Sequence, residues 1–221
     1  MQSRTFHYEN TMPYLTRETP SPEPIDCRIL TAALDLYVSK GYHNVSIHEI
    51  QKQANVSIGS IYNHFGGKEG IAKALYDHLL NEMNEMVDSV IEQGGNSIDQ
   101  CNSIIALLFE YTETRSNIIA YILHAKHGEF INDEKPMCCG EPFQRMRNIV
   151  QQGIDNGEIK SGNSWVASSS IFGPAIRLIH LRLDGVIDLL LPELYDETIN
   201  SIWSGMSVQN SINQSSLSAA S

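Results

Sequence analysis

Apolar side chains recur at intervals of three and four residues along almost the whole chain, and no segment alternates between apolar and polar residues over the length of a strand. This periodicity predicts an all-α protein. The first amphipathic helix carries its apolar face between Ile29 and Tyr37. It should end near Gly41, because glycine readily takes the left-handed conformation that terminates helices.

The next two predicted helices are short, and particular residue types mark their ends. Ser46, followed three residues later by Glu49, predicts a capping box at the start of the second helix. That helix should stop at Asn55, since asparagine tolerates positive φ better than most non-glycine residues do. A third helix is expected over residues 57–65, so a tight turn at residues 54–57 separates the two.

Longer helical patterns follow these short ones. The first should begin after Gly66 and run to Gly94. The next patterns cover residues 98–108, 118–127 and 143–154. The last two helices, residues 165–187 with a kink at Pro174 and residues 191–206, are apolar on more than one face. Such helices need cover on both sides, so a second copy of the chain is expected to pack against them.

Composition divides the chain into four regions. Residues 1–24 hold four of the eight prolines and should form a flexible arm. Residues 25–80 contain the three short helices, and we call this region the head. Residues 81–206 form a larger helical region, and residues 207–221, rich in Ser, Asn and Gln, are predicted to be a disordered tail.

The head has the spacing of a helix-turn-helix, a motif that places its second helix in the major groove of DNA. The segment from Arg28 to Leu75 resembles the N-terminal domain of the tetracycline-repressor (TetR/AcrR) family of transcriptional regulators. The positions in family register are Gly41, Tyr42, Ser46, Ile50, Ala54, Val56, Ser57, Gly59, Ile61, Tyr62, His64, Phe65, Lys68 and Glu69. Asn55 departs from the usual glycine but can hold the same left-handed turn. The C-terminal half resembles the family only in its helix count and its final two helices.

The resemblance implies a set of DNA-binding residues and a role for each. Ser46 and the start of the second helix would contact the phosphate backbone of one DNA strand. Tyr62, His64 and Lys68 would contact the backbone of the other strand. The residues facing base edges would be Ser57, Ile58, Gly59, Ser60 and Asn63. Gly59 would let the helix lie close to the groove floor. Asn63 is suited to reading adenine, and Ile58 to contacting a thymine methyl group.

The net charge of −11 at first argues against a nucleic-acid partner, because phosphates are neutralised by cations. The charges are unevenly distributed, however. The head carries five basic and five acidic residues, whereas residues 81–221 carry eight basic and 18 acidic ones. A neutral head can still hold DNA through hydroxyls, backbone N–H groups and helix N-termini. Such binding should depend only weakly on salt.

Residues 81–206 offer candidates for binding a small-molecule effector. Met86, Phe109, Tyr111, Tyr121 and His124 could line an apolar pocket, although each could equally be ordinary core. His124, His127, Cys138 and Cys139 are candidates for soft-metal ligation or thiol sensing. Their spacing matches no defined zinc pattern, so neither a metal nor another cofactor is expected.

Other features exclude several protein classes. Four cysteines are too few for a disulfide scaffold, and the N-terminus does not resemble a signal peptide. The apolar runs are too short to span a membrane, so we expect a cytoplasmic protein without a membrane partner. Motifs of the common enzyme classes, such as G-x-S-x-G and H-E-x-x-H, are absent, which argues against an enzyme.

These observations predict a homodimeric, sequence-specific DNA-binding regulator. As the resemblance implies, it would be a repressor that a small-molecule effector releases from a palindromic operator, and it would dimerise through its last two helices. Two alternatives stay open. One is a helical protein-interaction module whose head does not bind DNA. The other is a variant of the regulator that responds to thiol-reactive compounds or to metal.

Overall fold

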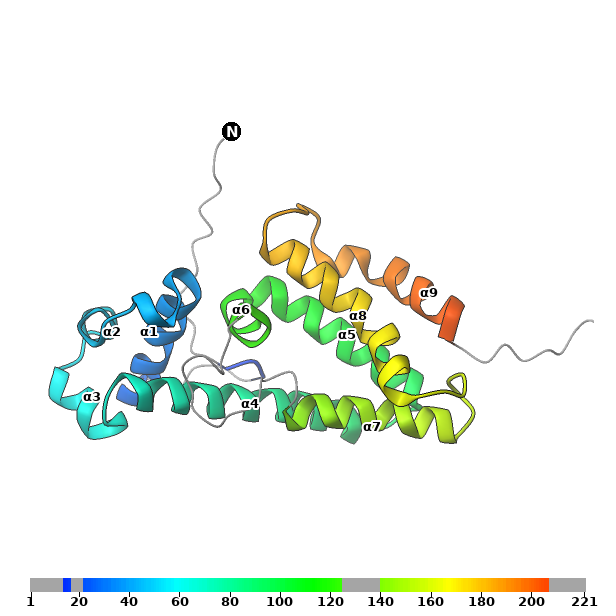
Figure 1. Cartoon of the computed structure of the whole chain (residues 1–221), viewed down its shortest axis with the longest axis horizontal. Coiled ribbons are helices and arrows are strands. Elements are labelled where there is room, and N and C mark those ends of the chain that lie inside the picture. Colours follow the sequence, from blue (N-terminus) through cyan, green and yellow to red (C-terminus); the bar gives the residue numbers. More distant parts are fainter. Residues whose placement is uncertain (1–13, 17–21, 125–139, 207–221) are drawn as a thin grey trace, which may run out of the picture.

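The computed structural model describes residues 14–16, 22–124 and 140–206, and its regular elements there are all helical (Figure 1). Nine α-helices lie in these residues, which confirms the all-α prediction. They are α1 (Ile25–Lys40), α2 (Ile47–Ala54), α3 (Ile58–Phe65), α4 (Lys68–Gln93), α5 (Ser97–Thr114), α6 (Ser116–His124), α7 (Glu141–Asp155), α8 (Ser164–Leu183) and α9 (Tyr195–Met206). Two 3₁₀ turns, η1 (Tyr42–Asn44) and η4 (Leu191–Leu194), complete the set.

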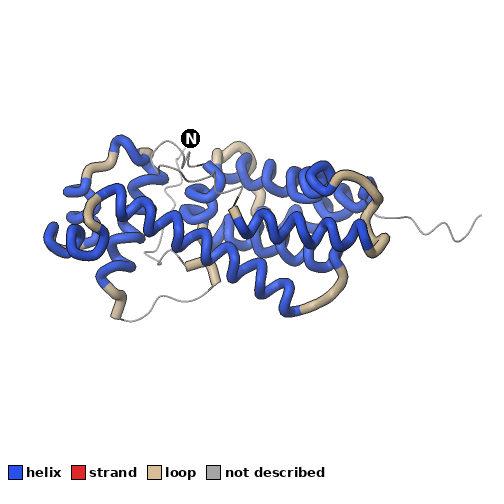
Figure 2. The backbone as a smooth tube through the Cα atoms, turned by 60° about the horizontal axis from the view of Figure 1, so that its bottom comes forward, coloured by secondary structure: helices blue, strands red, loops and turns tan. Residues whose placement is uncertain are grey.

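The helices form an elongated molecule with α1, α2 and α3 at one end (Figure 1). Helix α4 starts at this end and runs along the molecule, where α5 and α7 pack against it. Helices α8 and α9 lie over α5 on the far side. Figure 2 shows the same arrangement after a 60° turn. The expected boundary between the head and the larger helical region, at residue 80, falls inside α4, so one continuous helix joins the two.

Local residue types set the ends of the short helices, as predicted. The Ser46 side chain accepts a hydrogen bond from the N–H of Glu49, whose carboxylate accepts one from the N–H of Ser46, so the capping box is present. Asn55 ends α2 in the left-handed conformation, with φ 51° and ψ 52°. Among the described residues it is the one non-glycine residue with positive φ. The turn between α2 and α3 therefore depends on an asparagine.

The end of α8 and the start of the last helix differ from the prediction. Helix α8 stops at Leu183, four residues early, and Gly185 follows with φ 69°. Residues 191–194 form η4 rather than the start of an α-helix. The loop is held to α5 because Glu113 accepts a bidentate hydrogen bond from Arg182 and another, at 3.1 Å, from the N–H of Leu191. These contacts bend the chain away from the helical path.

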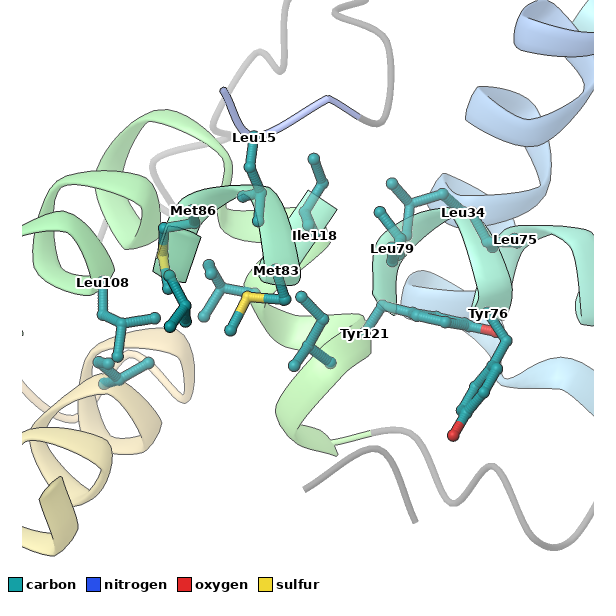
Figure 3. Close-up of a cluster of buried hydrophobic side chains, with 14 of the residues drawn as sticks. Leu15, Leu34, Leu75, Tyr76, Leu79, Met83, Met86, Leu108, Ile118 and Tyr121 are labelled. Carbon is teal, nitrogen blue, oxygen red and sulfur yellow. The ribbon is translucent and has the colours of Figure 1, made fainter. Parts of the chain in front are cut away.

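One hydrophobic cluster fills the molecule and includes the predicted face of α4. All six residues of that face are buried: Ile71, Leu75, Leu79, Met83, Met86 and Val90. Leu15, which precedes the helices, is also buried in this cluster (Figure 3). Residues 14–16 thus depart from the expected flexible arm, because Leu15 buries its side chain here. Within the described residues, no helix combines the length and apolarity needed to cross a bilayer.

Candidate nucleic-acid interface

Side chains of α1 and α2 hold the turn between α2 and α3 by hydrogen bonds to its backbone carbonyls. Arg28, in the first turn of α1, donates from Nη2 to the carbonyl oxygens of Ala54 at 2.6 Å and Asn55 at 2.5 Å. The Gln51 amide donates to the carbonyl oxygen of Val56 at 2.9 Å. These bonds satisfy the carbonyl oxygen of Ala54, the last residue of α2, and the carbonyl oxygens of Asn55 and Val56 in the turn that follows it. They also fix the orientation of α3 against α1.

Helix α3 has one buried face and one exposed face. Ile61 is fully buried, and Val56, Ile58 and Phe65 are partly buried against the core. Tyr62 is 55% exposed. Ser57, Gly59, Asn63 and His64 are also exposed, while Ser60 is partly buried. Apart from Ile58, the residues with a predicted DNA role on α3 lie on or beside the exposed face, which carries hydroxyl, amide and imidazole groups.

The hydroxyls at the helix N-termini already have partners in the protein. Ser57 Oγ accepts from the N–H of Ser60 at 3.0 Å and lies 2.8 Å from Ser60 Oγ. Ser46 Oγ donates its proton to the Glu49 carboxylate at 2.8 Å. Because a hydroxyl has a single proton, Ser46 cannot donate to a phosphate without giving up this bond. The first backbone N–H groups of α2 are therefore better donors at this end.

Lys68 lies at the start of α4, beside η1. Its Nζ is 4.1 Å from the centre of the Tyr42 ring, a cation–π distance. Burial lowers the pKa of the Lys68 ammonium and raises that of the Tyr42 phenol. The Lys68 charge is thus held against an aromatic ring at the corner between α3 and α4, next to the exposed face of α3.

The other cations of the head are largely engaged. Lys40 Nζ lies 2.8 Å from Glu49 Oε1, and Lys73 Nζ lies 2.6 Å from Asp77 Oδ1. The hydrogen bond from Lys40, together with those from Ser46, lowers the pKa of Glu49 to about 2. Arg28 is held by the carbonyls of the turn. The neutral charge balance inferred from the sequence thus corresponds to a surface that offers few uncommitted cations.

Two residues that fix this geometry were not found by reasoning from the sequence. Arg28 was recognised only as the start of the family-like segment, since its partners lie 26 and 27 residues away. Gly70 was not singled out at all. A Cβ atom at residue 70 would lie 1.7 Å from the carbonyl oxygen of Phe65, so the α3–α4 corner in this structure requires a glycine. An isolated glycine within a helical pattern is the available sequence signal for such a contact.

The effector candidates occupy several environments. Met86, Phe109 and Tyr121 are buried in the core, Tyr111 is partly buried, and His124 is exposed. None of the five is among the described residues that line the small void between α4, α5, α6, α7 and α8. This void has a volume of about 10 Å³, and the described residues that line it are all apolar: Met83, Leu108, Ile119, Ile122, Leu123, Phe143, Ile176 and Ile179. It holds no molecule larger than one water.

The metal and thiol candidates are only partly described. His127, Cys138 and Cys139 lie outside the described residues. The His124 ring stacks on His180, with centroids 4.7 Å apart, and burial together with His180 lowers the pKa of His124. Among the residues that the structure describes, no group of three or more His, Cys, Asp or Glu side chains could hold a metal ion.

Sequence comparisons place this arrangement among known proteins. Residues 29–75 match the model of the tetR family of bacterial regulatory proteins. The HTH-type transcriptional regulator YvkB of Bacillus subtilis (strain 168) is 32% identical over 177 residues, 75% of this chain and 88% of YvkB. The fatty acid metabolism regulator protein of the same organism is 28% identical over 152 residues, 66% of this chain and 77% of that protein.

Solved structures share the fold. A tetR family transcription regulator from Shewanella sp. PV-4 superposes with a TM-score of 0.68 at 17% identity, covering 85% of this chain and all of that one. FadR of Bacillus subtilis, solved in complex with stearoyl-CoA, gives a TM-score of 0.66 at 23% identity, covering 80% of this chain and 97% of FadR. The two-part architecture of this chain therefore recurs among tetR family regulators.

Proposed function

The chain belongs to the tetR family of bacterial transcriptional regulators, and on this premise we propose that it binds a palindromic operator as a homodimer and is released by a small-molecule effector. The observation that supports this most is the exposed face of α3, where polar side chains surround the 55%-exposed Tyr62 ring. A large aromatic side chain left in solvent beside amide and imidazole groups suits contact with a DNA backbone.

Residue roles follow from position on this face. Tyr62, His64 and Lys68, together with the N-terminus of α2, bind backbone phosphates and set the register. Gly59 and Asn63 meet base edges, and Asn63 pairs with adenine. Ser57 caps α3, Ser60 pairs its hydroxyl with that of Ser57, and both hydroxyls also contact DNA. Ile58 packs partly against the core and offers the rest of its side chain to a thymine methyl group.

Dimerisation uses α8 and α9. Trp165 is 62% exposed and Val166 66% exposed at the start of α8. A groove of about 370 Å³ runs between α8 and α9, with Pro174, Leu178 and Leu194 among its lining residues. An isologous pair would cover these apolar surfaces, as two-fold symmetry allows. Substituting Leu178 by Asp should yield a monomer by light scattering.

The effector enters the space around the apolar void. At about 10 Å³ the void is too small for a ligand, so binding must push the surrounding helices apart. Helix α6 lines the void with Ile119 and Ile122 and is tied to α1 by a 2.8 Å hydrogen bond from Asn117 to Asp35. Displacement of α6 therefore pulls on the head and changes the spacing of the two α3 helices.

A hydrocarbon chain suits this wholly apolar lining, and the FadR structure named above is a complex with stearoyl-CoA. We therefore place the effector among molecules with an acyl chain. Stearoyl-CoA should raise the melting temperature at constant protein concentration, whereas coenzyme A alone should not. Equal melting temperatures with both compounds would reject an acyl-chain effector.

Selection of bound DNA from a random pool tests the regulator against the interaction module. The regulator enriches one palindrome, and the enrichment persists at moderate salt. A module with a non-binding head enriches nothing, even at low salt. Replacing Cys138 and Cys139 by Ser should leave effector-driven release intact; loss of the response would favour the thiol- or metal-responsive variant.

A further inference from the structure

A short piece of the chain before α1 is folded onto the helices. The side chain of Leu15 is only 4% exposed and belongs to the core cluster. Figure 3 shows it pointing toward Met83 of α4 and Ile118 of α6. Leu15 stands outside every helix, yet it fills part of the junction between α4 and α6. The segment therefore contributes to the packing of two helices that join the head to the rest of the molecule.

Polar groups hold the backbone of the same segment. Glu82, on α4, accepts hydrogen bonds at Oε2 from the N–H of Leu15 at 2.9 Å and of Thr16 at 3.4 Å. Arg115, between α5 and α6, donates from Nε to the carbonyl oxygen of Tyr14 at 3.2 Å. A carboxylate thus faces two backbone donors while a guanidinium faces a backbone acceptor. Both are charge-assisted bonds, which are stronger than bonds between neutral groups.

The side chains of Tyr14 and Thr16 reach further contacts. The Tyr14 ring meets His78 of α4 edge to face, with centroids 5.1 Å apart, and its hydroxyl lies 3.8 Å from Sγ of Cys27 in α1. The Thr16 hydroxyl lies 3.4 Å from Glu85 Oε2. Three consecutive residues therefore bridge α1, α4 and the corner between α5 and α6.

The burial of Glu82 shows that residues 14–16 are bound at a desolvated carboxylate and not at a solvent-exposed side chain. The residue is only 1% exposed, near the middle of α4. A buried carboxylate is costly unless donors surround it, and the N–H groups of Leu15 and Thr16 supply two of them. Detaching the segment would remove these donors and expose the apolar surface beneath Leu15. Both effects favour keeping the segment bound.

We propose that Glu82, Arg115 and the apolar surface between them form a peptide-binding site that residues 14–16 occupy in cis. The ligand class is a short, bent peptide segment with a leucine at its centre. Because the site lies at the middle of α4, its occupant acts as a strap that restrains α4 against α1 and the α5–α6 corner. Neither the site nor its restraint of α4 rests on the proposed DNA-binding function.

Hydrogen exchange of the full chain without DNA tests the site. The Leu15 amide should exchange about tenfold to a hundredfold more slowly than in an unstructured peptide, the factor expected from burying one leucine. Leu15→Ala and Glu82→Gln should each remove most of this protection. Pro22→Ala, at an exposed position before α1, and Glu92→Gln, exposed on α4, are the matched controls and should leave it unchanged.

The same data test the restraint of α4. Amides around Glu82 should exchange faster in Leu15→Ala than in the unchanged chain, while those of α9 stay the same. Leu15→Ala leaves every helical residue in place, so this readout survives even if Glu82→Gln fails to fold. An unprotected Leu15 amide in the unchanged chain would overturn the site. Unchanged exchange of α4 in Leu15→Ala would overturn the strap.

Discussion

Replacing Gly59 by alanine should stabilise the protein while weakening its binding to DNA. Gly59 is exposed in the first turn of α3. A Cβ atom there would meet one protein atom within 4 Å, Ser57 Oγ at 3.7 Å, an ordinary van der Waals distance. Alanine is favoured over glycine in a helix by roughly 0.5–1 kcal/mol. For a chain of this size we expect the melting temperature to rise by about 1–3 °C.

The expected loss of DNA affinity has a different origin. If α3 lies in the major groove with Gly59 at the groove floor, the added methyl group displaces the helix from the base edges. Loss of one good base contact costs about 1–3 kcal/mol, so each head should bind about tenfold to a hundredfold more weakly. Fluorescence anisotropy with the selected operator measures this loss, and a thermal melt of the same sample measures stability.

The opposite signs of the two effects make the experiment decisive. Gly162→Ala, at an exposed position in the loop before α8 with nothing within 4 Å of its Cβ, is the control and should leave operator affinity unchanged. A Gly59→Ala protein that melts higher but binds the operator within about twofold of the unchanged chain would refute the placement of this face in the groove.

Three further predictions concern charge. Among the five cations of the head, Lys40 and Lys73 are paired with carboxylates and Arg28 with carbonyls, so Lys52 and Lys68 remain to contact phosphates. Two such lysines in each head of the dimer predict that the logarithm of the operator association constant falls with the logarithm of salt concentration with a slope of roughly −4. A slope near −8 would contradict this pairing of the cations. Because the pKa of Glu49 is about 2 in the folded protein against an ordinary 4.5, the ionised carboxylate stabilises the fold above pH 4.5, and this stabilisation is lost as pH falls toward 2. The melting temperature of the unchanged chain should exceed that of Glu49→Gln above pH 4.5, and the difference should shrink between pH 4.5 and 2. A difference independent of pH would contradict the lowered pKa. Glu113→Gln removes the charge from a largely buried hydrogen-bonded pair with Arg182 and should cost about 2 kcal/mol in a denaturant titration. The exposed Glu110→Gln should cost little, and equal costs would contradict the role of the pair.

The helix ends of the head could be predicted because they depend on neighbouring residues. Ser46 and Glu49 are three residues apart and form their capping box within one turn, and Asn55 takes the left-handed conformation by itself. The exposed face of α3 was also predictable, since helical periodicity separates Ile61 from Tyr62 and Asn63. These features require no knowledge of how distant helices pack.

Features that depend on distant packing could not be predicted. The void is lined by residues of five helices. Met83, Leu108 and Ile122 line it, each one to three positions along the chain from the predicted Met86, Phe109 and Tyr121. Small rotations of packed helices decide which side chain faces such a void, and the sequence does not show them. Leu15 lies in a segment without periodicity, so nothing in the sequence indicated its burial. Arg28 could not be assigned to the turn without knowing how α1 crosses α2.

Readout of a base by Asn63 tests the central claim most directly. Selection from random DNA is carried out with the unchanged chain, with Asn63→Ala and with His43→Ala, an exposed control in η1. We predict one palindrome for the unchanged chain and the control. In Asn63→Ala one adenine position of each half-site should lose its base preference while the other positions keep theirs. Failure of the unchanged chain to enrich any palindrome at low salt would contradict the account.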